Sequence, residues 1–326
     1  MSEVTVAIPV RNGGTLLAGT LAALATQTVL HELLICDSGS SDGSVALARK
    51  HHARVIEVEP ERFSHGGTRN LLMSEAKGSH VAFLTQDAEP AGERWLERLL
   101  GVFDLASDVG LVYGPYLPRP GVPAAVRLEL QRWFASLAPD GAPRVDRLRP
   151  DDSRVPVRTL MGPAGFFTDA NACIARKAWE RAPFREVAYA EDRVLAIDML
   201  RAGYAKVYVP DAAVVHSHAY TPTQELRRCF DEWRGLREVY GWREPASPAR
   251  LARNLRGELG GVRRELVREG VSERERRTTL AAAATRHLMR LVGALMGSRA
   301  DRLPGCVRRR LSLEGRGSFS PLQLDL

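Results

Sequence analysis

Polar side chains that can bind a metal or move a proton follow several apolar runs of this chain. The clearest case is Asp87, which stands three residues beyond the apolar run 81–84 and three residues before Pro90. Four apolar residues in a row are typical of a strand buried on both faces, and proline cannot donate to the next rung, so we expect the strand to end near Glu89. A carboxylate at the carboxyl end of such a strand can hold Mg²⁺ or Mn²⁺ against a diphosphate, although a solvated aspartate would leave the same pattern.

Three further apolar runs also end in polar residues. In chain order these residues are Asn12, Asp37 with Ser38, and His216 with His218. In a parallel sheet the carboxyl ends of the strands share one edge, so we expect Asn12, Asp37 and Asp87 to lie together. Such a cluster can hold a nucleotide, with Asp37 accepting a hydrogen bond from a base or a ribose hydroxyl. Each residue alone is weak evidence, because Asp and Ser also favour turns and the polar run 38–43 can be a simple helix cap.

Runs typical of strands alternate with stretches that carry apolar residues at helical spacing. The predicted strands cover residues 4–10, 32–37, 54–58, 81–84, 109–113 and 206–209. The predicted helices cover residues 16–24, 44–50, 68–76, 93–103, 124–135 and 191–202. This alternation predicts an α/β fold with a mostly parallel sheet and helices on both faces. The polar, proline-rich segment 139–163 predicts a mobile loop.

Composition places the chain among soluble globular proteins. Its 326 residues can bury a large core, and its 44% hydrophobic and 26% charged residues are ordinary values. The four cysteines are widely scattered, which argues against a zinc site or a disulfide framework and favours a reducing compartment. The first residues lack a basic run followed by an apolar one, and no apolar stretch approaches the roughly 20 residues of a spanning helix. We therefore expect a cytoplasmic protein.

Positive charge is concentrated in the last third of the chain. From Glu225 onward there are 22 arginines, no lysine and 13 acidic residues, whereas the preceding part carries 24 basic and 26 acidic residues. The pattern after Thr223 is almost entirely helical. This break predicts a domain of residues 1–222 followed by a helical, arginine-rich extension of residues 223–326.

One helix of this extension has an apolar stripe. The stripe consists of Leu288, Leu291, Val292, Leu295 and Met296. Arg286 and Arg290 flank it and the triplet 308–310 follows, so the helix can lie peripherally on an anionic membrane surface. The alternative is that the stripe packs on the domain of residues 1–222 while the arginines are solvated. Nucleic acid is disfavoured as a partner because the extension has no interleaved aromatic residues for stacking.

The order of these motifs resembles that of family 2 glycosyltransferases, which have the GT-A fold. The matching stretches lie within roughly residues 1–220 and are 8–12, 37–43, 84–88, 190–192 and 215–216. The run Phe-Ser-His-Gly-Gly-Thr-Arg-Asn at 63–70 and the variant Thr85-Gln86-Asp87 are similar to bacterial rhamnosyltransferases. The resemblance implies a Rossmann-like GT-A sheet flanked by helices, with the helical extension added at its C-terminal side.

The resemblance also implies roles for individual residues. The donor-binding residues would be Pro9, Arg11, Asn12, Asp37, Ser38, Gly39, Asp42, Gly66, Arg69, Gln86 and Asp87. The ligands of a Mg²⁺ or Mn²⁺ cofactor would be Asp87 and a histidine, with His216 preferred over His218. The usual Asp-x-Asp of the family reads Thr85-Gln86-Asp87 here, which keeps only the second carboxylate.

Asp192 matches the catalytic base of the family. Inverting transfer needs a carboxylate that takes the proton of the acceptor hydroxyl while that oxygen attacks the anomeric carbon. A structural alternative exists, because Glu191 and Asp192 at the start of a helix also stabilise its dipole.

The function implied is that of an inverting, metal-dependent glycosyltransferase. It would move a sugar, L-rhamnose from dTDP-rhamnose, to a saccharide or lipid-linked acceptor in cell-surface polysaccharide synthesis. A nicotinamide-dependent oxidoreductase is disfavoured because the turn 12–15 lacks the Gly-x-Gly-x-x-Gly spacing. A nucleotidyltransferase would carry its glycine-rich loop after the first strand, whereas Gly66-Gly67 precedes the fourth. A catalytically weak membrane scaffold is the third alternative, and the retention of Asp87 and Asp192 argues against it.

Overall fold

The computed structural model describes residues 4–149 and 156–322, and these form two compact units. The first unit contains the chain through residue 117, then 133–187 and 191–216, while the second contains 118–132, 188–190 and the chain from 217 onward. The units therefore interleave along the sequence. The single division after residue 222 stays a prediction.

The first unit is built on an eight-stranded sheet with the strand order β3-β2-β1-β4-β9-β6-β10-β8. Its strands are β1 Val4–Val10, β2 Glu32–Asp37, β3 Arg54–Glu57, β4 His80–Leu84, β6 Val109–Tyr113, β8 Arg144–Asp146, β9 Asn171–Ala175 and β10 Ala205–Tyr208. Strands β3, β2, β1 and β4 are parallel neighbours, as are β6 and β10. Strand β9 pairs antiparallel with both β4 and β6, and β8 pairs antiparallel with β10. The predicted α/β fold with a mostly parallel sheet is confirmed.

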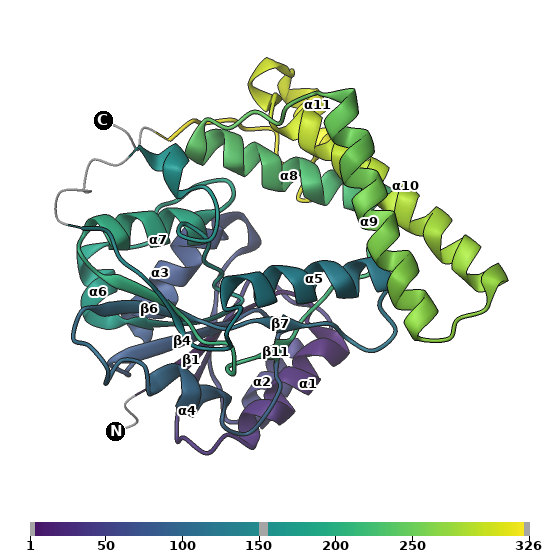
Figure 1. Cartoon of the computed structure of the whole chain (residues 1–326). Helices are drawn as coiled ribbons and strands as arrows, with labels where there is room; N and C mark the ends of the chain where they lie inside the picture. The colour runs from purple at the N-terminus through teal and green to yellow at the C-terminus, as the bar shows by residue number, and fades with distance from the viewer. Residues whose placement is uncertain (1–3, 150–155, 323–326) are drawn as a thin grey trace. The chain divides into compact units, whose positions relative to one another are not determined.

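Helices cover both faces of this sheet (Figure 1). The core on one face joins alternate β1 residues to α1 Gly14–Ala25, α2 Ser44–Lys50 and α4 Trp95–Leu100. Figure 1 shows α3 His65–Glu75, α6 Arg176–Arg181 and α7 Glu191–Arg201 on the opposite face. Helix α3 begins three residues earlier than predicted because the Ser64 hydroxyl caps it, accepting a hydrogen bond from the Gly67 amide at 3.1 Å.

A small second sheet lies beyond the carboxyl end of β4. It has the order β5-β11-β7, formed by β5 Glu89–Pro90, β11 Val214–Val215 and β7 Tyr116–Leu117. Strand β4 already ends at Leu84, and Pro90 belongs to β5, which pairs antiparallel with β11. The expectation that Pro90 terminates the Asp87 strand was therefore wrong, although Asp87 does follow the end of β4. Proline is tolerated in β5 because this strand lies at the edge of its sheet.

The segment 139–163 was predicted as a mobile loop, and its described part contains two ordered elements. Residues Arg144–Asp146 form the edge strand β8, and Val157–Leu160 form a 3₁₀ turn, η3; residues 150–155 lie outside the described residues. Strand β8 pairs with β10, and the Asp146 carboxylate lies 3.0 Å from the buried Lys206 ammonium. This ion pair links the segment to the sheet, a long-range contact that composition does not reveal.

The second unit is helical, as predicted. Besides residues 124–132 of α5 Ala124–Leu137, it contains α8 Pro222–Tyr240, α9 Pro248–Arg268, α10 Glu273–Gly297 and α11 Gly305–Leu311. Two further 3₁₀ turns within the described residues are η1 Pro60–Arg62 in the first unit and η4 Ala300–Arg302 in the second. None of the helices within the described residues has the length and apolar character needed to cross a bilayer.

Helix α10 packs on α8 through small residues. A Cβ atom at Gly293 would lie 2.4 Å from the Leu226 carbonyl oxygen, and one at Gly297 would lie 2.4 Å from the Phe230 carbonyl oxygen. Leu288 of the stripe is 52% exposed. Glycine lets the two helix backbones approach more closely than leucine would. Packing of the stripe on the domain of residues 1–222 stays a prediction.

The arginines next to this stripe are ion-paired inside the unit. Arg286 donates to Glu225 and to Glu129 at 2.7 Å each, and Arg290 donates to Glu129 at 2.8 Å and to Glu225 at 3.5 Å. These four charges link α5, α8 and α10. Arg286 and Arg290 thus hold helices together, and the expectation that they serve a membrane surface has to be corrected.

Candidate active site

The loops after β1 and β2 bring the predicted donor-binding residues together. The Asn12 amide donates to Ser40 Oγ at 2.8 Å, and Asn12 Oδ1 accepts from the Ser41 amide at 2.8 Å. Asp42 Oδ2 accepts from the Gly14 amide at 2.9 Å, and its hydrogen bonds lower the pKa of Asp42. These contacts fix the two loops against each other at the carboxyl edge of the sheet.

Asp37 is the buried acceptor of this edge. Its Oδ1 accepts hydrogen bonds from the Gly39 and Ser40 amides at 3.0 and 2.9 Å, which shapes the turn after β2. Its Oδ2 is buried and has no hydrogen-bond partner among the described residues. A buried carboxylate oxygen without a donor is costly, so this atom has the capacity to bind a hydroxyl or N–H group of a ligand.

The next strand end contributes Gln86 and Asp87. Gln86 Oε1 accepts from the Arg11 amide at 2.9 Å, and its Nε2 donates to the Arg11 carbonyl at 3.2 Å. Gln86 thus joins the loop after β4 to the loop after β1. The Thr85 hydroxyl, at the position of the family's first aspartate, is buried without a hydrogen-bond partner among the described residues.

Asp87 lies against His216. The distance from Asp87 Oδ1 to His216 Nδ1 is 3.5 Å, and both side chains are largely buried. The Tyr116 ring packs edge-on against His216 at 4.8 Å between ring centroids, which restricts the imidazole. A carboxylate and an imidazole at this separation can supply two ligands to a metal ion. His218 follows two residues later, is exposed and belongs to the second unit, so its role as a ligand stays a prediction.

A buried asparagine positions the segments that carry Tyr116 and His216. Asn171 Nδ2 donates to the Pro115 carbonyl at 3.1 Å and to the Ala212 carbonyl at 2.8 Å, and its Oδ1 accepts from Trp95 Nε1 at 2.8 Å. The side chain therefore satisfies backbone groups just before β7 and just before β11. Asn171 was not among the predicted site residues, although a polar residue within an apolar run was a usable signal.

A buried ion-pair network leads from this region to α7. Arg69 is 4% exposed; its Nη2 donates to Asp169 at 2.8 Å, and its Nη1 lies 3.1 Å from Glu191. Thr168, next to Asp169, is hydrogen-bonded to the Tyr116 hydroxyl. The guanidinium of Arg69 thus contacts protein carboxylates, while its predicted contact to the donor stays a prediction. Tyr116 and Asp169 were also not among the predicted site residues.

Asp192 is the second residue of α7 and forms no arginine ion pair with the residues that the structure describes. Its Oδ1 accepts from the Arg193 amide at 2.7 Å. Burial, followed by the adjacent Glu191 charge, raises the pKa of Asp192 to about 7. The neighbouring Ala190 has a φ of 65°, a conformation that L-residues rarely adopt, so the chain is held in an uncommon turn just before the helix. A carboxylate with a pKa near 7 is well matched to a general base at neutral pH.

The remaining predicted donor-binding residues have identifiable structural contacts. Pro9 lies in β1, paired in register with Cys36, and the buried Ser38 donates through its amide to the Val10 carbonyl at 2.9 Å. Gly39 has a φ of 85°. A Cβ atom at Gly66 would lie 2.3 Å from the Arg185 carbonyl oxygen, so backbone packing alone accounts for that glycine. Contact of these residues with a donor stays a prediction.

Solved structures share this fold. A mannosyltransferase from Pyrobaculum calidifontis, solved with GDP-Man and Mn²⁺, is 17% identical, with a TM-score of 0.57 over 91% of this chain and 87% of that one. The S. aureus protein TarS 1-349, solved with UDP-GlcNAc, is 14% identical, with a TM-score of 0.50 over 95% of this chain and 82% of that one. At this level of identity the likeness shows the fold, and the fold is GT-A.

Proteins similar in sequence give more information about the family and its activity. The O-antigen chain rhamnosyltransferase RfbN of Salmonella typhimurium is 32% identical over 237 residues, which are 70% of this chain and 71% of the relative. The O-antigen chain rhamnosyltransferase WbaN of Salmonella anatum is 33% identical over 204 residues, 61% of each chain. The model of "Glycosyl transferase family 2" matches residues 5–174, which include the strand ends that carry Asn12, Asp37 and Asp87. The chain belongs to glycosyl transferase family 2 and is a glycosyltransferase.

Proposed function

We propose that this enzyme transfers L-rhamnose from dTDP-rhamnose, with inversion, to a saccharide or lipid-linked acceptor in the synthesis of a cell-surface polysaccharide. The observation that carries the donor assignment is the 32% identity to the O-antigen chain rhamnosyltransferase RfbN over 237 residues. The run 63–70 and the Thr85-Gln86-Asp87 variant, which are similar to rhamnosyltransferases, support the same donor. Family membership sets aside the nucleotidyltransferase and oxidoreductase alternatives.

The side chains at Asp87 and His216 are suitable ligands for a divalent cation. Asp87 offers a carboxylate and His216 an imidazole nitrogen 3.5 Å away, a combination that suits Mn²⁺ as well as Mg²⁺. His218, two residues along the chain, is a further candidate ligand. When bound, such a cation would neutralise charge on the diphosphate leaving group. With a single carboxylate, the site would rely on oxygens of the donor to complete the coordination.

The proton transfer is assigned to Asp192. One of its carboxylate oxygens takes the proton of the acceptor hydroxyl, and the acceptor oxygen forms a bond to the anomeric carbon. The bond between that carbon and the diphosphate oxygen breaks, and the electron pair leaves with the nucleoside diphosphate. Attack from the face opposite the leaving group inverts the anomeric configuration. Its raised pKa supports Asp192 in this role, because a weaker acid is a better proton acceptor.

The donor nucleoside is assigned to the loops after β1 and β2. Asp37 Oδ2 is buried without a partner among the described residues, so it supports a hydrogen bond from the base or the ribose. Replacing Asp37 by asparagine keeps one acceptor oxygen for the turn and removes the second. We expect this change to weaken dTDP binding by about 10- to 100-fold, in keeping with one hydrogen bond to a charged group.

The donor proposal is tested by turnover of purified protein with a panel of nucleotide sugars in the presence of Mn²⁺. We expect hydrolysis or transfer with dTDP-rhamnose and little with UDP- or GDP-sugars. Calorimetric titration of dTDP into wild type and Asp37→Asn checks the nucleoside site. Selective turnover of a UDP-sugar would overturn the donor assignment, and absence of turnover with every donor would favour the scaffold alternative.

The acceptor side of the proposal includes a membrane surface. A lipid-linked saccharide would present its reacting hydroxyl close to a bilayer, so peripheral contact of the enzyme would bring Asp192 to the acceptor. The corrected roles of Arg286 and Arg290 mean that another surface has to make this contact.

A further inference from the structure

One side of helix α9 carries four exposed arginines. Arg253, Arg256, Arg263 and Arg264 recur at spacings of three, seven and one residues, which places them on one side of the helix. All four are exposed. Within the described part of the chain none of them has an acidic partner or a hydrogen-bond acceptor. We call these four residues the α9 arginine face.

This lack of partners is specific to one side of α9. On the other side, Val262 and Leu266 are buried in a cluster with α5 and α10 residues. The acidic residues of the helix are already used, because Glu265 lies 3.4 Å from Arg127 and Glu258 lies 3.8 Å from Arg132. The α9 arginine face therefore presents four uncompensated positive charges to solvent.

Two glycines lie within this face without a packing reason. A Cβ atom at Gly257 would meet nothing within 4 Å, and one at Gly260 would meet Arg264 Nη1 at 3.5 Å, an ordinary contact. By contrast, a Cβ atom at the neighbouring Gly261 would lie 2.0 Å from Arg132 Nη2, so packing requires that glycine. Glycine inside a helix lowers its stability. Since no contact within the unit requires glycine at 257 and 260, we look for the reason in a contact outside the unit.

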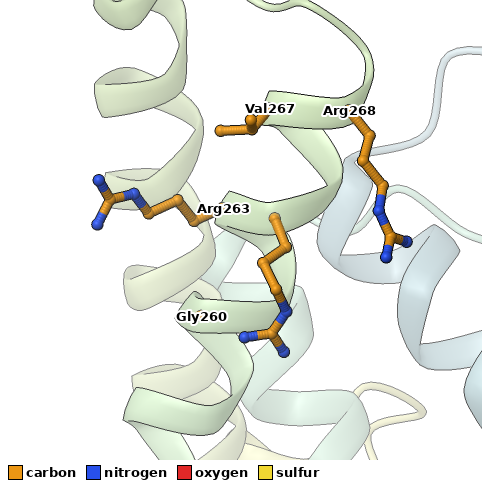
Figure 2. Close-up of a pocket in the computed structure, with 5 residues that line it drawn as sticks. Gly260, Arg263, Val267 and Arg268 are labelled. Carbon is orange, nitrogen blue, oxygen red and sulfur yellow. The ribbon is translucent and has the colours of Figure 1, made fainter.

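The C-terminal half of the face is hollowed. An open hollow of about 500 Å³ is lined by Gly260, Arg263, Arg264, Val267 and Arg268. Figure 2 shows Arg263 and Arg268 extending to opposite sides of α9, with Gly260 on the preceding turn. Val267 at this end is 53% exposed. Guanidinium groups around a glycine turn, with an apolar side chain beside them, form a surface on which phosphate groups can approach the helix backbone.

We propose that the α9 arginine face docks the enzyme on an anionic phospholipid bilayer. A straight row from Arg253 to Arg264 is about 16 Å long at the rise of an α-helix and matches a plane of head-group phosphates. Exposed Val267 suits the boundary between head groups and acyl chains. Helix α9 contains no Trp, Tyr or Phe on which nucleic-acid bases would stack. The inference deepens the proposed function, on whose lipid-linked acceptor the choice of a bilayer rests.

The test is flotation of the full chain with phosphatidylcholine vesicles that contain or lack phosphatidylglycerol. We expect binding that requires phosphatidylglycerol and weakens as salt rises. The variant R253Q/R256Q/R263Q/R264Q should lose on the order of 100-fold or more in vesicle partitioning. The matched control R274Q/R302Q/R309Q/R310Q removes the same charge from other exposed positions of the second unit and should lose much less.

Each other outcome of this experiment overturns the proposal. Failure of wild type to float with anionic vesicles excludes the docking, and equal loss in both quadruple variants shows that diffuse charge is responsible. Tighter binding of a single-stranded oligonucleotide than of vesicles by the α9 arginine face would assign it to nucleic acid instead. Melting temperature and vesicle-free turnover of the nucleotide sugar, measured on the same variants, separate this result from misfolding and from failure of the proposed transfer.

Discussion

The proposed proton acceptor Asp192 offers the sharpest test of the active site, because its pKa depends on neighbours that can be changed singly. Burial and the Glu191 charge raise this pKa to about 7. Since only the ionised carboxylate accepts a proton, kcat/KM should fall about tenfold per pH unit below 7 and level off above it. Asp192→Asn should lower kcat by roughly 10²–10⁴ while leaving dTDP affinity nearly unchanged.

The substitution Glu191→Gln tests the cause of the raised pKa. Removing a negative charge beside Asp192 makes its ionised form easier to reach, so the pKa falls and activity persists to lower pH. Arg69 lies 3.1 Å from Glu191 and already offsets part of its charge. We therefore expect the acidic limb of the profile to move down by about 1 pH unit rather than more. The maximal rate should also drop, because Arg69 loses a partner.

The assay is kcat/KM for sugar transfer between pH 5 and 9, the range in which a pKa near 7 is visible. Glu57→Gln is the control, since it removes an exposed carboxylate that pairs with Arg49 on the surface. Its profile should coincide with that of wild type. An acidic limb that stays in place or moves upward in Glu191→Gln would refute the assignment of Asp192 as the titrating base.

Three further predictions concern the metal, the positioning asparagine and the glycine contacts. Asp87→Ala should abolish transfer as EDTA does, and added Mn²⁺ should restore only the EDTA-treated wild type; activity that survives in the variant would contradict the metal site. Asn171→Ala should lower the free energy of unfolding by about 3 kcal/mol because three buried groups lose their partner, whereas exposed Asn254→Ala should change it little in urea titrations. Gly293→Ala should destabilise the fold because of the 2.4 Å approach to a carbonyl oxygen. Gly257→Ala should raise stability by up to about 1 kcal/mol, and equal melting temperatures would refute this reasoning.

Much of the active-site edge could be predicted from the sequence because it depends on local pattern. Apolar runs define strands, and a parallel order brings their carboxyl ends together, so Asn12, Asp37 and Asp87 were placed on one edge without any knowledge of tertiary contacts. Even the positive φ of Asn12 agrees with the turn chemistry of its residue type. Where a motif follows from backbone geometry, a single sequence is sufficient.

Contacts between distant segments could not be predicted in this way. Asn171 satisfies two carbonyls that lie more than 40 residues away in sequence, and nothing near Asn171 identifies them. The same limit applies to α10. Its leucine stripe and its Gly293/Gly297 side both have helical spacing, and only the structure shows that the glycine side contacts α8. Hydrophobic periodicity identifies a helix face but not the neighbour that will cover it.

The ion pairs of Arg69 distinguish Asp192, the proposed base, from its two acidic neighbours. Asp169, Glu191 and Asp192 share one buried region, and burial raises the pKa of Asp169 to about 8 and that of Asp192 to about 7. A raised pKa alone therefore does not identify the base. Arg69 contacts Asp169 and Glu191 directly, while Asp192 accepts a hydrogen bond from the Arg193 backbone amide. We propose Asp192 as the base because its carboxylate is not held in an arginine ion pair among the described residues, so an oxygen is available to accept the proton of the acceptor hydroxyl.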